Sequence, residues 1–419
     1  MKEKRLIVSL PGRSVGELRQ NRSGLVQWIP DPDWEDEGQM PRLGFDFLRR
    51  LGPRDHASDL PAWFENLLPE RGSVLRTRLC QHHGLRDGQA FPLLRALGRD
   101  LIGAVEVRDA AQERLEGTSD ASAGTETPGR AESAESADRL SALTGMQLKF
   151  SMSMVNERLV LPAVGSRSQW IVKIPGSDYA ELAEVENATM TWARLAGFDV
   201  PSHAVMPFSA LEGVPLDWIE QPAPVFAIQR FDRRADGSKV HQEDLCQALG
   251  LRPQDKYGDR VLVSYSGATR LVVDACGEHD GREMARRIGF VIASGNSDAH
   301  LKNFSLVWGD RIRPVLAPCY DLVSTIAWPT LGWQRPDGPR LALRLGGESL
   351  FKRLDAAAVE RFASDAGYAW VKEAIFEGME RARGAWPEVA GSTPLRMRAA
   401  IMQHWRAVPV LASMGTLPA

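Results

Sequence analysis

The sequence predicts an α+β fold of two lobes, a small β-rich lobe followed by a mostly helical one, with an extra β-rich region in front of them. Three observations support this. Short apolar runs between turn residues fill the first hundred positions, a polar acidic stretch follows, and helical periodicity dominates after about residue 240. With 419 residues, 43% of them hydrophobic and 25% charged, the chain has room for two or three globular domains.

Residues 1–108 are expected to form the extra β-rich region. The runs RLIVSL and GLVQWI predict strands, and LPAWFENLLPE predicts a helix. Residues 109–138 carry almost no large apolar side chains and more acids than bases. Such a segment cannot bury enough surface to offset the entropy of ordering it, so we interpret it as a flexible linker.

Residues 139–232 are expected to form the small lobe. RLVLP and QWIVKIP predict the two strands of a hairpin, ELAEVENATMTWARLAG predicts an amphipathic helix ending at Gly197, and VFAIQRFDRR predicts another strand. Residues 233–419, beginning with HQEDLCQALG, are expected to form the helical lobe, interrupted by one section around residues 294–306.

Composition and charge argue against several classes of protein. No stretch reaches the run of about 18 apolar residues that a membrane span needs, and the N-terminus has no signal-peptide pattern, so a cytoplasmic protein is expected. The four cysteines lie far apart without a C-x-x-C pair, which favours buried thiols over a zinc site. A net charge of −3 argues against broad electrostatic binding of nucleic acid.

The stretch SGNSDAHLKNFSL concentrates polar side chains directly before a predicted strand. A helix with one apolar face, EMARRIGFVIASG, ends just before it at Gly295. Two short strands, FSLVW and RIRPVL, follow with a turn at Gly309-Asp310, and then comes the segment APCYDLVST. The predicted order is therefore buried helix, polar loop, hairpin and second acidic loop.

This order of elements is typical of enzymes that transfer phosphoryl groups. The reaction requires a hydroxyl held in the right orientation, bound Mg²⁺, and positive groups that offset the negative charge of the phosphate. In the protein-kinase arrangement a catalytic Asp is followed by four residues and a metal-binding Asn, and a second Asp beyond a hairpin holds Mg²⁺. Asp298, Asn303 and Asp321 have this spacing and these flanking elements. We predict Asp298 as the catalytic group and Asn303 and Asp321 as oxygen ligands of Mg²⁺.

Two further polar residues of the loop are assigned to the same site. Lys302 is interpreted as a phosphate contact that assists transfer, with a simple surface ion pair as the alternative. His300 is expected to fix the loop at the cofactor site by hydrogen bonding. A soft-metal role for His300 is disfavoured because no cysteine or histidine lies at usable spacing.

A nucleotide-phosphate site is predicted upstream. Lys173 lies within the apolar strand QWIVKIP, where a lysine is unusual unless its charge has a partner. Phosphates and a helix carboxylate would supply one, with Glu186 as the first candidate and Glu184 and Glu181 as rivals. Backbone N–H groups from Gly145 through Gln147 to Lys149 are expected to cradle phosphate, although no G-x-G-x-x-G is present.

At this point the sequence resembles the HipA-type serine/threonine kinases, toxins of bacterial toxin–antitoxin systems. The resemblance covers most of the chain and rests on ordered stretches: LPAWFENLLPE, LLRALGRDLIGAVEV, TGMQLKFS, WIVKIP, ENATMTWARLAGFDVP, AIQRFDRR, VHQEDLCQALG, GNSDAHLKNFSL and APCYDLVST. It implies a two-lobed protein-kinase-like fold, ATP and Mg²⁺ as cofactors, an aminoacyl-tRNA synthetase as substrate with inhibition of translation and growth, and a small HipB-like DNA-binding antitoxin as partner. DNA would be contacted only through the antitoxin.

The resemblance also implies roles for individual residues. Asp298 matches the catalytic Asp, Asn303 and Asp321 the magnesium ligands, and Lys173 the lysine that contacts ATP phosphates. The segment from Gln229 to Phe231 matches the hinge that meets adenine. A regulatory serine often precedes the phosphate loop in this family, and here Ser141 and Thr144 are the two candidates for autophosphorylation.

Two other readings compete. A metal-dependent phosphoesterase would explain GNSD as a variant of G-N-H-[DE], but Ser297 replaces the histidine and the other metal motifs are missing. A pseudokinase acting as an interaction partner of an antitoxin or DNA complex is the second alternative. The joint presence of Lys173, Asp298, Asn303 and Asp321 favours an active kinase over it.

Overall fold

The computed structural model describes two units of the chain. Unit 1 comprises Met1–Asp178, Met206–Pro253 and Trp308–Ile312, and unit 2 comprises Tyr179–Val205, Gln254–Val307 and Arg313–Ala419. The residues described within them are 3–36, 42–49, 52–56, 60–111, 147–162, 168–179, 181–258, 263–309, 312–328, 334–335 and 337–415. Most of the predicted linker, and the positions of Ser141, Thr144 and Gly145, lie outside the described residues.

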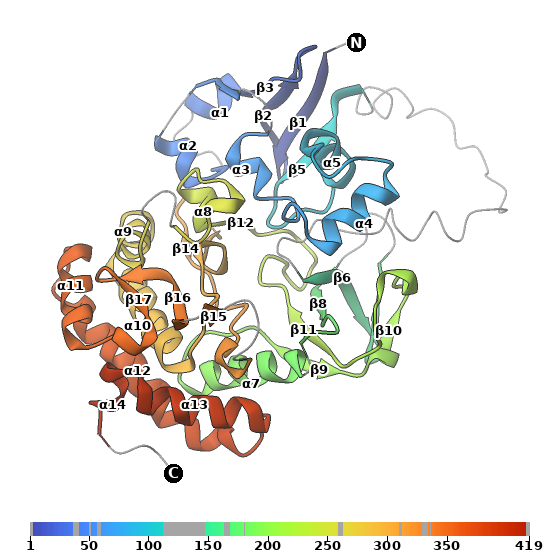
Figure 1. Ribbon diagram of the computed structural model, residues 1–419. Helices are drawn as coiled ribbons and strands as arrows, with labels where there is room; N and C mark the ends of the chain where they lie inside the picture. The colour runs from blue at the N-terminus through green and yellow to red at the C-terminus, as the bar shows by residue number, and fades with distance from the viewer. Residues whose placement is uncertain are drawn as a thin grey trace. The chain divides into compact units, whose positions relative to one another are not determined.

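Unit 1 begins with an antiparallel sheet in the order β4-β3-β2-β1-β5 (Figure 1). Buried residues alternate with half-buried ones along β1, and its buried side chains face a core rich in aromatic rings from the sheet and from α2 and α3. The expected strands RLIVSL and GLVQWI and the helix in LPAWFENLLPE are therefore confirmed. The elements are β1 (Lys4–Leu10), β2 (Arg13–Gln20), β3 (Val26–Pro30), α1 (Pro32–Asp36), α2 (Phe45–Arg49), β4 (Arg54–His56), α3 (Ala62–Glu65), α4 (Val74–His82), α5 (Ala90–Leu97) and β5 (Glu106–Asp109).

A second sheet of unit 1 has the neighbouring strands β10-β7-β6-β8-β11. The predicted hairpin between RLVLP and QWIVKIP is wrong, because β6 lies between β7 and β8 and pairs with both. The turn that decides this is Asn156-Glu157, where both residues have positive φ (48° and 63°), as in a two-residue hairpin turn from β6 to β7. The strands are β6 (Leu148–Val155), β7 (Arg158–Val160), β8 (Trp170–Ile174), β10 (Leu211–Glu212) and β11 (Val225–Gln229).

The start of HQEDLCQALG is a strand rather than a helix. β12 (His241–Asp244) leads into the short helix α8 (Leu245–Ala248), whose N-terminus Asp244 caps through a capping box with Gln247. All four strand residues are buried. Their polar groups find partners far away in the sequence, such as Leu43 O for His241 Nε2 at 2.7 Å, and these contacts override the helical pattern.

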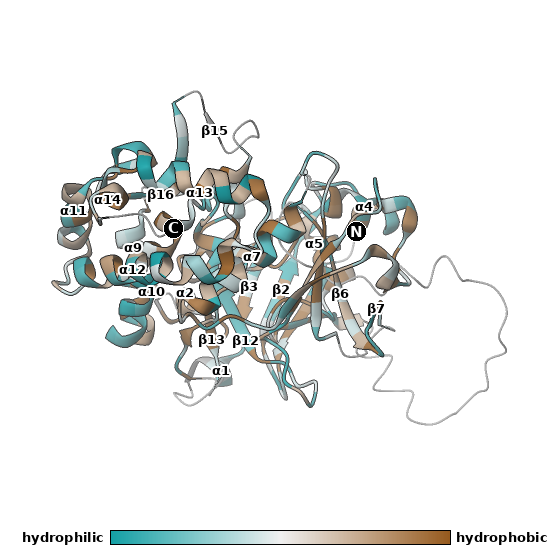
Figure 2. Cartoon of the chain, turned by 90° about the horizontal axis from the view of Figure 1, so that it is seen from below, coloured by the Kyte–Doolittle hydropathy of each residue, from teal (hydrophilic) through white to brown (hydrophobic). Residues whose placement is uncertain are grey.

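Unit 2 is mainly helical, as expected, and α10 packs closely on α12 (Figure 1). Two glycines allow this approach, since a Cβ at Gly289 would lie 2.3 Å from Ile375 O and one at Gly378 would lie 2.0 Å from Arg286 O. Figure 2 shows hydrophilic and hydrophobic residues mixed along these helices, in keeping with one buried face each. The helices are α7 (Leu182–Leu195), α9 (Tyr265–Cys276), α10 (Glu278–Ser294), α11 (Ala356–Ala366), α12 (Val371–Ala390), α13 (Leu395–Ala407) and α14 (Pro409–Ala412).

Three tryptophans, Trp192, Trp386 and Trp405, join α7, α12 and α13 in the core of unit 2. The remaining strands are β9 (His203–Met206), β13 (Ser305–Trp308), β14 (Val315–Leu316), β15 (Gln334–Arg335), β16 (Gly338–Leu345) and β17 (Glu348–Leu350). β13 pairs antiparallel with β14, which confirms the predicted ribbon after the polar loop. None of the helices in the described part of the chain is long and apolar enough to cross a membrane.

Candidate active site

The polar loop of unit 2 starts where α10 stops at Gly295. This residue has φ 61°, in the left-handed region, and a Cβ there would lie 2.4 Å from Ile326 Cδ1. Thr325 reinforces the exit, because its Oγ1 donates to Gly295 O at 3.2 Å and accepts from Ser297 N at 2.7 Å. The helix end and the segment beyond the ribbon therefore position the loop together.

Asp298 is held by its backbone. Its N–H donates to Asn296 Oδ1 at 2.9 Å, and its carbonyl accepts from His300 N at 2.7 Å and from Asn303 Nδ2 at 2.8 Å. The carboxylate is left for other contacts, and its Oδ1 accepts a hydrogen bond from the Tyr257 hydroxyl at 2.8 Å. The side chain of Asp298 is 30% exposed, so its carboxylate can be reached from solvent.

His300 packs beneath Asp298 as a neutral ring. Burial lowers the pKa of His300 well below its usual value and the Lys256 charge lowers it further, against an opposing effect of Asp321. Its Nε2 lies 4.0 Å from Asp298 Oδ1, too far for a hydrogen bond, and its Nδ1 has no hydrogen-bond partner among the described residues. The hydrogen bonds that fix the loop here come from the His300 backbone.

Lys302 lies in the short 3-10 turn Leu301–Asn303 and is 7% exposed. A surface ion pair is therefore the wrong alternative for this residue. Its carbonyl accepts a hydrogen bond from Tyr320 Oη at 2.8 Å, so the loop is tied to the residue before Asp321. Asp321 itself has φ 57°, a left-handed conformation that is uncommon outside glycine and is concentrated at functional sites.

The atoms of this loop and of Asp321 that could bind a metal ion are oxygens. Asn303 Nδ2 is engaged by the Asp298 carbonyl, which leaves Asn303 Oδ1 as the ligating atom of that amide. In the described part of the chain, no group of three or more His, Cys, Asp or Glu residues could hold a metal ion. One carboxylate and one amide fit Mg²⁺, which completes its coordination with water and phosphate oxygens.

Lys173 of β8 is 4% exposed and lies directly opposite Lys149 of β6 in the register of unit 1. Opposite residues of antiparallel strands place their side chains on the same face, and two like charges there are unfavourable without an anion. Lys173 Nζ also lies 5.6 Å from the Phe226 ring centroid. Gln147 Nε2 donates to Ile174 O at 3.2 Å, which fixes the chain at the start of β6.

Among the three glutamates proposed to partner the lysine, burial favours Glu186. Glu186 on α7 is 1% exposed, Glu184 is half-buried, and Glu181 pairs with Arg396 at 2.8 Å. A buried carboxylate requires a compensating partner, so Glu186 is the functional candidate of the set. Glu186 belongs to unit 2 and Lys173 to unit 1.

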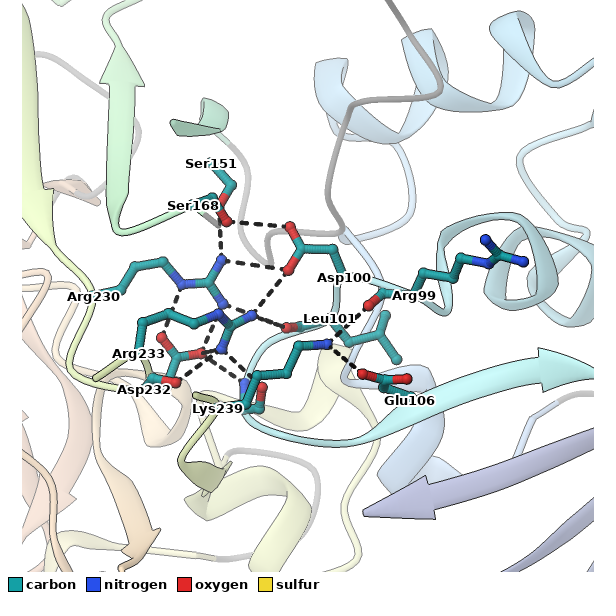
Figure 3. A network of polar contacts seen from close by, with 11 residues as sticks. Arg99, Asp100, Leu101, Glu106, Ser151, Ser168, Arg230, Asp232, Arg233 and Lys239 are labelled. Atoms are coloured by element: carbon teal, nitrogen blue, oxygen red, sulfur yellow. Dashed lines mark hydrogen bonds and ion pairs between the residues drawn. The ribbon is translucent and has the colours of Figure 1, made fainter. Parts of the chain in front are cut away.

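The predicted hinge begins at Gln229, the exposed last residue of β11 in unit 1, and ends at Phe231, which is half-buried. The residues between and after them form an ion-pair network that the sequence analysis missed (Figure 3). Arg230 and Arg233 both bond Asp232, at 2.7 and 2.9 Å, and Arg233 also bonds Asp100 at 2.9 Å. Burial alone would raise the pKa of Asp232, but the two guanidiniums outweigh it and hold that pKa below its usual value.

This network joins the segment of the predicted hinge to residues 100–103 and to β6. Gly103 N donates to Asp232 Oδ2 at 2.8 Å, Arg233 Nη2 donates to Leu101 O at 3.0 Å, and Arg230 Nη1 donates to Ser151 Oγ of β6 at 2.7 Å. The alternating charges of RFDRR were its only signal in the sequence. The segment of the predicted hinge is therefore held from two sides within unit 1.

Comparison with known families gives two matches along the chain. The HipA N-terminal domain family matches residues 6–108, and the family of the HipA-like C-terminal domain matches residues 141–386. Among individual relatives, the Y4dM protein of Sinorhizobium fredii strain NGR234, a candidate kinase by its name, is 32% identical over 412 residues, which are 94% of either chain.

A sequence and a solved structure of HipA from Shewanella oneidensis extend the comparison. The serine/threonine-protein kinase toxin HipA is 26% identical over 299 residues, or 64% of either chain. The solved complex of HipA, HipB and operator DNA contains a chain that aligns with a TM-score of 0.68 at 21% identity and covers 95% of this chain and 94% of that one. This likeness shows that the described chain has the kinase-like fold of that protein.

Proposed function

The chain belongs to the HipA family, and on this premise we propose that it is an ATP- and Mg²⁺-dependent kinase that phosphorylates serine or threonine in a protein. The observation that supports this most is the loop of unit 2. It holds Asp298 and Asn303 through one backbone carbonyl and presents the Asp298 carboxylate to solvent. This is the geometry expected of a group that orients an attacking hydroxyl beside a metal ligand.

Each site residue has a separate role in the proposed phosphoryl transfer. Asp298 orients the acceptor hydroxyl and takes its proton, while Lys302 offsets charge on the phosphoryl group. Asn303 and Asp321 would hold Mg²⁺, which would offset the negative charge of the phosphates. Lys173 with Lys149 and the segment from Gly145 to Gln147 would hold the ATP phosphates, the backbone from Gln229 to Phe231 would meet adenine, and Glu186 would pair with Lys173.

The domain division and the biological setting are also proposals. Residues 1–108 are the extra N-terminal region, 109–138 the linker, 139–232 the small lobe and 233–419 the helical lobe. We propose a HipB-like antitoxin as partner, because the similar Shewanella HipA was solved with HipB and operator DNA. An aminoacyl-tRNA synthetase in the cytoplasm is the proposed substrate, and Ser141 or Thr144 the proposed autophosphorylation site.

The test is incubation of the purified protein with Mg-ATP and a panel of aminoacyl-tRNA synthetases, with phosphoserine and phosphothreonine located by mass spectrometry. A kinase gives a phosphorylated synthetase that depends on added Mg²⁺ and on Asp298. Tight ATP binding with no transfer to a synthetase, to itself or to water would support the pseudokinase instead.

A further inference from the structure

The side chain of Tyr257 is hydrogen-bonded to the carboxylate of Asp298. The Tyr257 hydroxyl donates to Asp298 Oδ1 at 2.8 Å, both residues belong to unit 2, and the Tyr257 side chain is exposed. Its ring packs edge-on against His300 with centroids 5.2 Å apart, and Lys256 Nζ lies 5.2 Å from the Tyr257 ring centroid. A phenol is thus placed over the catalytic loop by contacts on two sides.

The backbone around Tyr257 is fixed to the same loop. Leu301 N donates to Lys256 O at 3.1 Å, which ties the two segments together beside Tyr257. On the other side, Gly258 has φ 73°, its N–H donates to Asp255 O at 2.9 Å, and a Cβ there would lie 2.1 Å from Val263 O. The exposed side chain can leave Asp298 by rotation about χ1 while this backbone stays in place.

We propose that Tyr257 fills the acceptor position of Asp298, so that the hydroxyl that receives phosphate must displace the Tyr257 hydroxyl. This inference rests on the proposed role of Asp298. A general base must lie within about 2.6–3.2 Å of the hydroxyl that it serves, and the phenol meets this criterion. Tyr257 is therefore bound as an acceptor hydroxyl would be.

The consequence is selection among acceptors. Water gains little by displacing a hydrogen bond to a carboxylate, whereas a serine or threonine on a protein segment brings further contacts that offset the loss. Tyr257 would thereby suppress futile hydrolysis of ATP and favour hydroxyls presented by a docked protein.

The experiment compares wild type with Tyr257→Phe, which keeps the ring and removes the hydroxyl. Two rates are measured with Mg-ATP: release of inorganic phosphate, with water as acceptor, and transfer to dephosphorylated casein. We expect hydrolysis to rise and the KM for casein to fall, each roughly three- to tenfold, the range for the net loss of one ordinary hydrogen bond. The KM for ATP should not change.

Tyr368→Phe is the matched control. Tyr368 stacks on Trp370 with centroids 5.2 Å apart in unit 2, and loss of its hydroxyl should leave both rates unaltered. A lower kcat of Tyr257→Phe with unchanged KM for casein would show that Tyr257 orients Asp298 and would overturn the inference. So would unaltered rates, or phosphotyrosine at position 257. A wild-type protein without any transfer would reject the proposed function, and the inference with it.

Discussion

At the scale of single residues, Asp298, the proposed catalytic group, is held in place by hydrogen bonds of its main chain. Its carbonyl and N–H are engaged by Asn303, His300 and Asn296, so the loop keeps its shape whatever the side chain of residue 298 carries. The carboxylate takes no part in these backbone hydrogen bonds, and its Oδ1 accepts a hydrogen bond from the Tyr257 hydroxyl. This separation makes the residue suitable for a clean test of chemistry.

The substitution Asp298→Asn should lower the rate of phosphate transfer on the order of 10² or more and leave ATP affinity largely unchanged, because it removes the proton acceptor and preserves the loop. Transfer rates and nucleotide binding are measured on the same preparation. Normal transfer by this variant would show that the role is misassigned.

Asp321→Asn should weaken the binding of Mg-ATP and not only lower the rate of transfer. The reason is that an amide oxygen carries no negative charge to offset the charge of the metal ion. Asn is chosen over Ala because residue 321 has φ 57°, which Asn tolerates and Ala does not. ATP affinity is titrated against Mg²⁺ concentration. An unaltered Mg²⁺ dependence would contradict the ligand role.

At the scale of elements, the pairing of α10 with α12 depends on glycines that allow backbone contact. A Cβ at Gly378 would lie 2.0 Å from Arg286 O, a backbone atom that cannot move aside cheaply. Since α10 ends at the candidate catalytic loop, any shift of this helix pair reaches Gly295 and the residues beyond it. The position of the loop therefore depends on how α10 packs against α12.

Gly378→Ala should destabilise the protein by about 1–3 kcal/mol or more through overpacking, measured as a lower Tm. Gly384→Ala is the control on the same helix. Nothing lies within 4 Å of its added Cβ, so it should raise helix stability by up to about 1 kcal/mol. Equal effects of the two substitutions would contradict the packing explanation.

At the scale of the whole molecule, long-range polar contacts hold segments of unit 1 together around Glu243. This fully buried carboxyl accepts from Trp63 Nε1 at 3.0 Å and from Phe45 N at 2.7 Å, bringing β12, α3 and α2 together. Burial raises the pKa of Glu243 to about 8 despite these donors. The folded chain thus retains a proton there that the unfolded chain would release near its ordinary pKa of about 4.5.

The sign of the pH effect follows from this raised pKa. The stability that Glu243 contributes is complete below about pH 4.5 and is lost as pH rises towards about 8, by at most about 1.4 kcal/mol per pH unit. Glu243→Gln cannot ionise, so its unfolding free energy relative to wild type should rise over this window and level off above it. Parallel pH profiles of the two proteins would rule the ionisation out.

The sequence by itself determined the features that are local in the chain. The interval from Asp298 to Asn303, the helix stop at Gly295 and the strand that carries Lys173 could be read because spacing and turn chemistry act over a few residues. The kinase-like fold was implied by the resemblance of these ordered stretches to a known family. The roles of the site residues remain a prediction.

Only the tertiary structure decided what depends on residues far apart. β6 pairs with both β7 and β8, and residues His241–Asp244 form a buried strand. Tyr257 and Asp298, which are 41 positions apart in the chain, form a hydrogen bond. The Asp232 network likewise joins the segment after β11 to Gly103 and Asp100. Buried polar groups require hydrogen-bond partners, and in this fold the partners come from distant parts of the chain. A local sequence pattern does not show which distant residue the partner is.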